Sequence, residues 1–205
     1  MKFIYTYLNI YIYIVIIMNN ISENKQIILQ NLYEMFNDRK LINKTENSKY
    51  KNLFNSAISD DELTVKFENK KYIIHFLKNI IKKQQILKLV DDESNNYVLV
   101  LMDAKSVKYV KDVKNLNNIE IFTNFELLIN PTKNIYLSQQ HILLNESEKN
   151  QLLDEYNCTL NELPKISIND PITRYYNAKN NDIFKIIRNN PISINSIVYR
   201  VVTEI

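Results

Sequence analysis

Glycine is absent from this chain of 205 residues. Glycine-rich loops cradle phosphate groups because a residue without a side chain lets the backbone approach the ligand closely. The chain therefore contains none of the common glycine-based nucleotide-binding motifs. The absence also leaves each turn that needs left-handed backbone to another residue, and asparagine is the next most suitable one.

Cysteine and histidine are scarce as well. Cys158 is the single cysteine, which excludes an internal disulfide and suits a reducing compartment. No histidine or lysine stands beside it in the sequence to activate it, so we interpret it as unreactive. His75 and His141 are the only histidines, and neither has metal-ligand spacing to Cys158. We therefore predict no catalytic residue, no metal site and no cofactor in this chain.

Alanine occurs at three positions only, whereas Asn, Ile, Lys and Tyr are abundant. The favoured residues have A+T-rich codons, so this bias reports the genome rather than the fold, and it points to an unusual genome such as that of a large DNA virus. Hydrophobic residues make up 45% and charged residues 24%, as in ordinary globular proteins. A net charge of +3 does not by itself require a nucleic-acid partner.

Residues 1–17 form an apolar leader whose translation is doubtful. Their sequence, MKFIYTYLNIYIYIVII, has one charge and is interrupted by tyrosines. It is shorter than the roughly twenty apolar residues that a membrane-spanning helix needs, and no small-residue cleavage site of a signal peptide follows it. Two interpretations remain open. Either translation begins at Met18 and no stable membrane association exists, or the segment is a lone membrane anchor.

Residues 18–135 alternate between helical and strand patterns, which predicts an α/β domain. Apolar residues recur at three- and four-residue spacing from Ser22 to a polar turn at residues 37–40, as in an amphipathic helix. The runs LTVKF and KYIIHFL predict a β-hairpin around Glu68-Asn69-Lys70. The other predicted elements are helices at 80–90, with Leu87 among the inward residues, and 106–114, and strands at 97–102 and 119–122.

Residues 136–205 predict a second, small mixed α/β domain, so the whole chain is α/β and α+β. Asn145 with Glu148 is typical of a capping box at a helix start, and Thr159 with Glu162 repeats it before Pro164. Asp170-Pro171 predicts another helix start, because Asp caps and Pro suits the first helical position. The runs DIFKIIR and IVYRVV then predict two strands.

The order of residues between 141 and 200 resembles the C-terminal assembly domain of the fifth subunit of eukaryote-type DNA-directed RNA polymerases, a domain that the archaeal enzyme carries as a small subunit of its own. One such dipeptide would be a weak signal, but the ordered set is specific. The residues that match the family pattern are His141, Leu143, Leu144, Glu148, Lys149, Leu152, Leu153, Tyr156, Leu163, Pro164, Asp170, Pro171, Tyr175, Asp182, Ile186, Arg188, Tyr199 and Arg200. A shorter run, YEMFNDR, resembles the opening helix of the eukaryotic subunit's N-terminal jaw domain.

The chain departs from this family at glycine positions. Asn177 and Asn181 stand where the family usually has Gly, and these turns can survive because Asn tolerates left-handed backbone. Lys40 replaces a further family Gly after the first helix. Ile194 lies near another and cannot easily adopt positive φ, so the loop around it is where we expect the domain to differ most.

The resemblance implies a non-catalytic polymerase subunit, with nucleotide addition and its metal in the large subunits. It implies that residues 136–205 dock on the largest subunit and that residues 18–135 form part of the jaw near downstream DNA. We expect an intracellular protein, in the virion or host cytoplasm if viral and in the nucleus if cellular. The predicted partner-docking residues are Leu163, Pro164, Asp170, Pro171, Tyr175, Tyr176, Arg188, Tyr199 and Arg200.

Lysines recur every three residues through the predicted helix at 106–114. They form a winding stripe, and residues 1–135 carry 19 basic against 15 acidic side chains. A solvated helix face is one interpretation; contact with DNA phosphates is the other, and the resemblance favours it. The predicted DNA-proximal residues are Lys105, Lys108, Lys111 and Lys114. The alternative function is an independent nucleic-acid-binding or nuclease-like α/β protein, although a nuclease needs clustered carboxylates for divalent metal and the strand LTVKF offers none.

Overall fold

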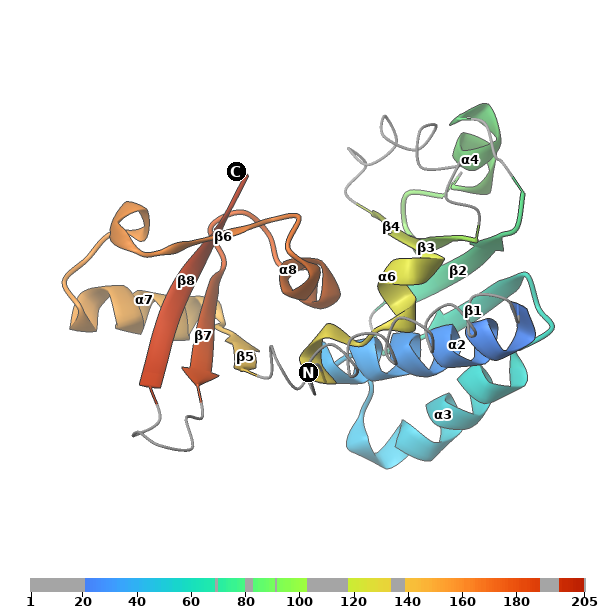
Figure 1. Ribbon diagram of the computed structural model, residues 1–205, viewed down its shortest axis with the longest axis horizontal. Helices are drawn as coiled ribbons and strands as arrows, with labels where there is room; N and C mark the ends of the chain where they lie inside the picture. The colour runs from blue at the N-terminus through green and yellow to red at the C-terminus, as the bar shows by residue number, and fades with distance from the viewer. Residues whose placement is uncertain are drawn as a thin grey trace, which may run out of the picture. The chain divides into compact units, whose positions relative to one another are not determined.

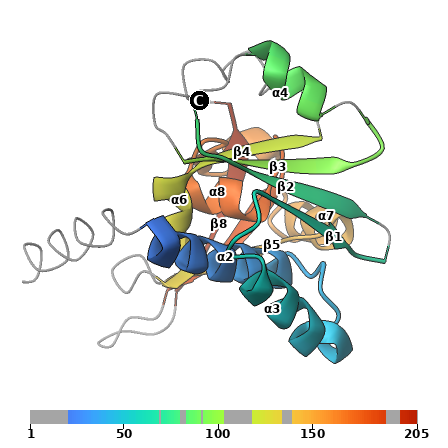
Figure 2. The ribbon, with the colours of Figure 1, turned by 90° about the vertical axis from the view of Figure 1, so that its right-hand side faces the viewer.

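The chain consists of two compact units, with the division after Leu128. The second unit begins a few residues before the predicted domain start at 136. The elements of each unit can be followed in Figures 1 and 2. The predictions for residues 1–17, for the helix at 106–114 and for Ile194 lie outside the described residues. The computed structural model describes residues 21–68, 70–79, 83–90, 92–102, 118–133, 139–188 and 196–204.

The N-terminal unit is built on a four-stranded sheet in the order β1-β2-β3-β4. Its strands are β1 (Glu62–Lys66), β2 (Lys71–Leu77), β3 (Asn96–Leu101) and β4 (Ile119–Thr123). β1 and β2 form the predicted antiparallel hairpin, in which Lys66 pairs with Lys71. β2, β3 and β4 run parallel, so the sheet is an α/β layer with one antiparallel edge strand, and the fold-class prediction is confirmed.

Helices cover both faces of this sheet. The helices are α2 (Ile21–Asp38), the 3₁₀ turn η1 (Lys44–Glu46), α3 (Asn47–Ser56), α4 (Lys83–Leu89) and α6 (Asn124–Leu128). Figure 1 shows α2 and α3 on one side of the sheet and α4 on the other. The α2 side is aromatic, because Phe36 lies 5.0 Å from the ring of Tyr72 and 6.0 Å from that of Phe54 in α3. Since α3 has no apolar stripe beyond Tyr50 and Phe54, the periodicity did not predict it.

The opposite face packs against α4. Ile86 is fully buried there against Leu99 and Leu101 of β3. Leu87, predicted to point inward, is 43% exposed, so that prediction is wrong. One helical position turns a side chain by about 100°, and in so short a helix only Ile86 faces the sheet squarely.

A buried ion pair ties α2 to β4. The Arg39 guanidinium donates to both carboxylate oxygens of Glu120, at 2.9 and 2.8 Å. The two side chains are only 5% and 14% exposed. Directly after Arg39, Lys40 adopts a φ of 58°, the left-handed conformation that the resemblance implied for this position. The polar turn at residues 37–40 therefore ends α2 and directs Arg39 toward the sheet.

The C-terminal unit holds a second four-stranded sheet, in the order β5-β7-β8-β6. β7 pairs antiparallel with β5 and β8, whereas β6 runs parallel to β8. This mixed sheet is consistent with the small α/β domain that the sequence predicts. The elements are η4 (Pro131–Lys133), β5 (Gln140–Leu143), α7 (Glu146–Glu155), η5 (Leu160–Glu162), β6 (Lys165–Ser167), α8 (Pro171–Tyr176), β7 (Ile183–Arg188) and β8 (Ser196–Thr203).

The predicted helix caps are present. The Asn145 side chain accepts from the Glu148 backbone N–H, and the Glu148 carboxylate accepts from the Asn145 N–H, which completes a capping box. Asp170 caps α8 by accepting from the Ile172 N–H at 2.8 Å. The sequence between Thr159 and Pro164 forms a single 3₁₀ turn with its own capping box rather than a longer helix.

Asparagine takes over the glycine turns of the family pattern. Asn177 has a φ of 51° at the end of α8, and Asn181 has a φ of 72° before β7. Asn157 adopts a φ of 47° after α7. The prediction that asparagine serves these turns is confirmed at Asn177 and Asn181.

The two faces of this sheet are covered by different helices, which flank β7 and β8 in Figure 1. Phe184 of β7 faces α8, where it contacts Tyr176 and joins a core with Ile172 and Val202. Tyr199 of β8 lies on the other face, because its cross-strand partner is Lys185, the next residue along β7. The far end of α7 reaches that face. Among the helices of the described residues, none is long and apolar enough to cross a lipid bilayer.

Candidate functional site

Strand register brings two predicted docking arginines to one face of the C-terminal sheet. Arg200 of β8 is paired with Phe184 of β7, and Arg188 stands four residues further along β7. Side chains alternate along a strand, so Phe184, Arg188 and Arg200 all point to the α8 side. His141 of β5 is paired with Ile186 and joins them on that side. We call His141, Arg188 and Arg200 the basic cluster.

The arginines of the basic cluster are half-buried and make few side-chain hydrogen bonds within the described residues. Arg188 Nε donates to Gln139 Oε1 at 3.2 Å. Arg200 Nε is buried and has no hydrogen-bond partner among the residues that the structure describes. None of the ion pairs found among the described residues includes either arginine. Within the part of the chain that the structure describes, the cluster therefore carries positive charge that no carboxylate pairs with.

His141 is the neutral member of the cluster. Its ring lies edge-on to Phe184, with 6.0 Å between ring centroids, and its Nδ1 lies 2.7 Å from the Gln139 carbonyl oxygen. Burial lowers the pKa of His141, and the charges of Arg200 and Arg188 lower it further. The Gln139 carbonyl and the Asp170 carboxylate act in the opposite direction. The Asp170 cap of α8 is therefore near enough to act electrostatically on this cluster.

The two tyrosines of α8 have different surroundings. Tyr175 is only 5% exposed, and its hydroxyl accepts from Asn130 Nδ2 at 3.5 Å. Its side chain therefore belongs to the interior of the unit. Tyr176 is half-buried beside the basic cluster, with its ring 5.7 Å from that of Phe184. Of the pair, only Tyr176 offers a surface to a partner.

The remaining predicted docking residues lie elsewhere in the unit. The Pro164 carbonyl accepts from the Val201 N–H at 2.8 Å, so Leu163-Pro164 leads into the edge strand β6. Pro171 is exposed at the first position of α8. Tyr199 lies on the opposite sheet face, with its ring 5.8 Å from that of Tyr156. The predicted set is thus divided between two faces.

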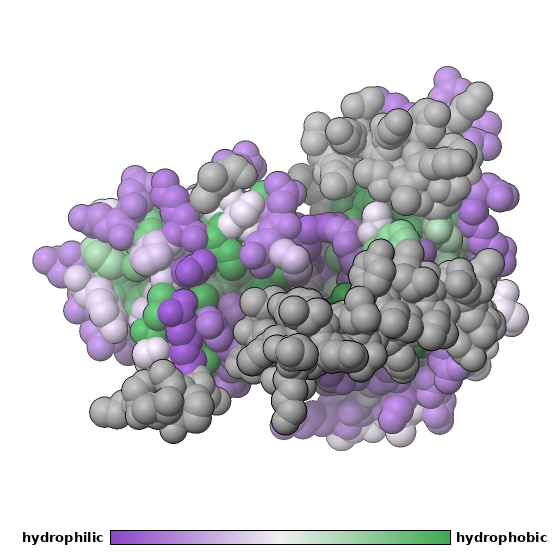
Figure 3. Space-filling model, in the orientation of Figure 1, coloured by the Kyte–Doolittle hydropathy of each residue, from purple (hydrophilic) through white to green (hydrophobic). Residues whose placement is uncertain are grey.

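The sequence reasoning overlooked two neighbours of these sites. Gln139, the acceptor for Arg188, precedes β5 by one residue, and the alternation Gln139, His141 was the available signal. Ile197 is 51% exposed on the Tyr199 face. An isolated exposed isoleucine carries no sequence pattern of its own. Figure 3 shows hydrophobic residues bordered by hydrophilic ones over the region of β7 and β8. The predicted DNA-proximal lysines, at 105, 108, 111 and 114, lie outside the described residues.

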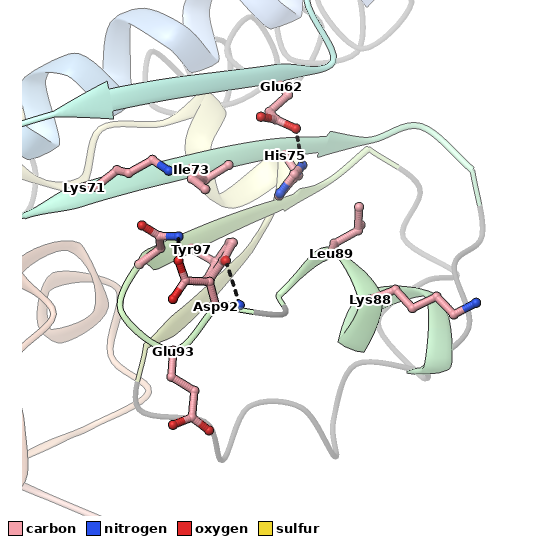
Figure 4. A pocket seen from close by; sticks show the side chains of 10 residues that line it. Glu62, Lys71, Ile73, His75, Lys88, Leu89, Asp92, Glu93 and Tyr97 are labelled. Atoms are coloured by element: carbon pink, nitrogen blue, oxygen red, sulfur yellow. Dashed lines mark hydrogen bonds and ion pairs between the residues drawn. The ribbon is translucent and has the colours of Figure 1, made fainter.

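The N-terminal unit contains a polar pocket of about 630 Å³ that is lined by one face of β2, the end of α4 and the turn that follows α4. Its floor holds His75, whose ring stacks on Tyr97 with an interplanar angle of 10°. Figure 4 shows the Glu62 carboxylate on His75 Nδ1, at 3.6 Å, and Asp92 beside Tyr97. Burial lowers the pKa of His75, which Glu62 opposes, and His75 Nε2 has no hydrogen-bond partner. The other residues that line the pocket are Lys71, Ile73, Lys88, Leu89, Glu93 and Asn95.

This pocket does not assemble a recognisable catalytic set. Asp92 is occupied by its own turn, since its carboxylate accepts from the Ser94 N–H and hydroxyl and from Asn95 Nδ2. Those bonds lower the pKa of Asp92. Within the described ranges, no group of three or more His, Cys, Asp or Glu side chains is placed to hold a metal ion. The C-terminal cluster is therefore the stronger candidate for a functional surface.

The C-terminal unit matches a known domain. Residues 129–202 match the family model described as RNA polymerase Rpb5, C-terminal domain. The chain is 40% identical over 68 residues to DNA-directed RNA polymerase subunit Rpo5 of Methanothermobacter thermautotrophicus, which covers 33% of this chain and 88% of that relative.

One longer relative matches nearly the whole chain, and another matches more than half of it. The chain is 29% identical over 198 residues to DNA-directed RNA polymerase subunit 5 of Acanthamoeba polyphaga mimivirus, covering 91% of this chain and 95% of that relative. It is 32% identical over 125 residues to the subunit rpabc1 of DNA-directed RNA polymerases I, II and III of Dictyostelium discoideum, covering 57% and 63%. The chain spans roughly half to two thirds of the length of several curated relatives that it matches.

The matches identify which kind of protein carries this domain. The chain belongs to the family of RNA polymerase subunit 5.

Proposed function

We propose that the chain is a non-catalytic subunit of a multisubunit DNA-directed RNA polymerase. Its C-terminal unit docks on the largest subunit, and its N-terminal unit forms part of the jaw near downstream DNA. The complex acts inside the cell or in a virion. The similarity to a mimivirus subunit along 91% of the chain supports a viral setting.

The observation that carries this proposal is the basic cluster. The family-pattern residues His141, Arg188 and Arg200 are separated in sequence, yet the sheet register brings them to one face beside α8. A fold does not need two half-buried arginines without carboxylate partners, because withdrawing a charge from water costs free energy. A partner that supplies the missing acceptors would account for them.

The direct test is co-purification. An affinity-tagged full chain, expressed with the other polymerase subunits, should retain the largest subunit through washing and gel filtration. An independent nuclease-like protein would purify without polymerase subunits and would degrade nucleic acid with divalent metal. Recovery of the tagged chain alone, from cells that contain assembled polymerase, contradicts the proposal.

The jaw role has its own test. Replacing Lys105, Lys108 and Lys111 with Gln should weaken DNA binding by the assembled polymerase. Each lysine–phosphate interaction that is removed should reduce the slope of log K against log salt by about one. Because the complex still assembles through the C-terminal unit, subunit content is the control. An unchanged slope assigns the lysines to a solvated surface.

A further inference from the structure

We propose that the basic cluster receives an aspartate or glutamate side chain of the largest polymerase subunit, held between Arg188 and Arg200. This inference rests on the proposed function and adds the chemistry of the partner at this site. The occupant is an acidic residue on a protein surface, and the arginines supply the donors.

The geometry defines a receiving site rather than two unrelated surface charges. β7 and β8 are paired so that Arg188 lies opposite Ser196 and Arg200 lies opposite Phe184. Between them on this face stand Ile186, fully within the core, and its cross-strand neighbour Val198, which is half-buried. The arginines therefore flank a low apolar floor, with His141 along one side. An apolar floor lowers the local dielectric and strengthens a charged interaction made above it.

Among the described residues, no carboxylate forms an ion pair with either arginine of the cluster. Arg200 Nε is buried and has no partner among the described residues, so the donors that Arg200 can offer to a partner are those of its terminal Nη1 and Nη2 groups. Arg188 uses one donor on the neutral Gln139 amide oxygen, which leaves its charge uncompensated. A guanidinium has five N–H donors in a planar fork that matches a carboxylate in two-point geometry. An acidic side chain is thus the occupant that satisfies both charge and hydrogen bonding.

Asp170, the acid that acts on His141 among the described residues, does not fill that role. Asp170 lies within electrostatic reach of His141, but its Oδ1 accepts from the Ile172 N–H and begins α8. No ion pair joins Asp170 to Arg188 or Arg200, although all three residues belong to the part of the chain that the structure describes. The charge of the cluster therefore remains net positive, and complementarity requires an anionic partner.

The test uses the full chain and the purified largest subunit. Arg200→Gln and, separately, Arg188→Gln should each weaken the complex by at least about tenfold, because a buried charge on the partner loses its donors. Lys185→Gln is the matched control. Lys185 also lies on β7, but it is paired with Tyr199 and points to the sheet face opposite the two arginines. The affinity of this variant should therefore stay within about twofold of that of the wild type.

A second measurement identifies the acceptor and does not depend on a loss of affinity. Arg200→Lys keeps the positive charge and places a primary amine in the site. A carbodiimide then joins that amine to a neighbouring carboxylate with loss of water. Mass spectrometry should find the Lys side chain linked to an Asp or Glu of the largest subunit, and Lys185 should give no such link.

The outcomes separate this inference from the proposed function. If the wild-type chain does not bind the largest subunit, both fail. If the wild type binds, both Gln variants bind equally well and no carboxylate is linked, the acidic occupant is wrong while docking stands. A thermal unfolding curve shows that each variant is folded. An Arg200→Gln variant that fails to fold leaves Arg188→Gln and the cross-link to decide.

Discussion

Asparagine performs at single positions what glycine performs in most turns. Asn181 is exposed, has a φ of 72°, and its N–H donates to the Val202 carbonyl at 2.9 Å. Left-handed backbone costs a residue with a Cβ roughly 1–2 kcal/mol. The penalty is smaller for Asn than for most residues, because its short polar side chain can form local hydrogen bonds. A chain without glycine thus keeps the turns of its family by using the residue with the smallest remaining penalty.

Asn181→Ala should lower the free energy of unfolding by about 1 kcal/mol, because alanine pays the full left-handed penalty. Asn181→Gly should change it by less than about 0.5 kcal/mol, since relief of strain is offset by greater freedom of the unfolded chain. Asn180→Ala, one residue earlier and also exposed, is the control. Urea denaturation of the three variants measures this. Equal stability of Asn181→Ala and the wild type would show that the turn carries no strain.

The pocket histidine predicts a pH dependence of stability. Burial lowers the pKa of His75 in the folded chain below its usual 6.5. Below 6.5 the unfolded chain therefore binds more protons than the folded one, and folding stability falls as the pH falls toward the lowered value. Well above pH 6.5 His75 is neutral in both states, and the stability that is lost on acidification is fully present. The Glu62 carboxylate opposes the shift without reversing its direction.

His75→Gln should remove this part of the acid sensitivity. Between about pH 7.5 and pH 5.5 the unfolded imidazole gains its proton, so the wild type should lose more unfolding free energy than the variant over this range. Denaturant unfolding at the two pH values gives the comparison, with His141 unchanged in both proteins. Parallel loss of stability in both proteins would mean that His75 takes up its proton equally well when folded.

At the scale of elements, the ion pair between α2 and β4 holds a helix end on the sheet. Removing one partner of a buried pair leaves an uncompensated charge, so Arg39→Met should cost roughly 3–5 kcal/mol. The double variant Arg39→Met with Glu120→Met should be considerably more stable than the sum of the two single variants predicts. Urea denaturation of the four proteins completes the cycle. Additive losses would show that the two side chains do not interact in solution.

The sequence predicted those elements whose boundaries are chemically marked. The capping box at Asn145 and the Asp170-Pro171 start gave α7 and α8, and the β-branched runs gave β7 and β8. The short edge strands β5 and β6 were not predicted, because three or four residues are too few to show the alternation of apolar and polar side chains that marks a strand. Their position depends on pairing with β7 and β8, which are distant in sequence.

The candidate site was likewise predictable only where local sequence carries the signal. The arginines were predicted as partner-docking from the resemblance, but nothing in their spacing indicated that Arg188 and Arg200 share a face while Tyr199 lies on the other. The register of β7 and β8 decides this. The burial of Tyr175 was equally hidden, and its hydroxyl is bonded to Asn130, a residue 45 positions away in the sequence.

For the whole molecule, the central question is whether the C-terminal unit is a self-contained docking domain. The archaeal relative supports this, since the 68 matched residues are close to the size of this unit and cover 88% of that relative's length. A domain of about seventy residues buries only about 60% of the surface that its unfolded chain exposes, so it should be marginally stable alone. Binding to the folded form should then stabilise it, in proportion to the logarithm of partner concentration over Kd.

The most direct measurement compares the two units for binding to the largest polymerase subunit. Residues 129–205 and residues 21–128 are prepared separately, and each is titrated against the purified subunit beside the full chain. The account predicts that residues 129–205 fold and bind with an affinity within about tenfold of the full chain. Residues 21–128 should bind far more weakly, because the proposed docking surface belongs to the C-terminal unit. Binding by residues 21–128 together with no binding by a folded 129–205 segment would contradict it.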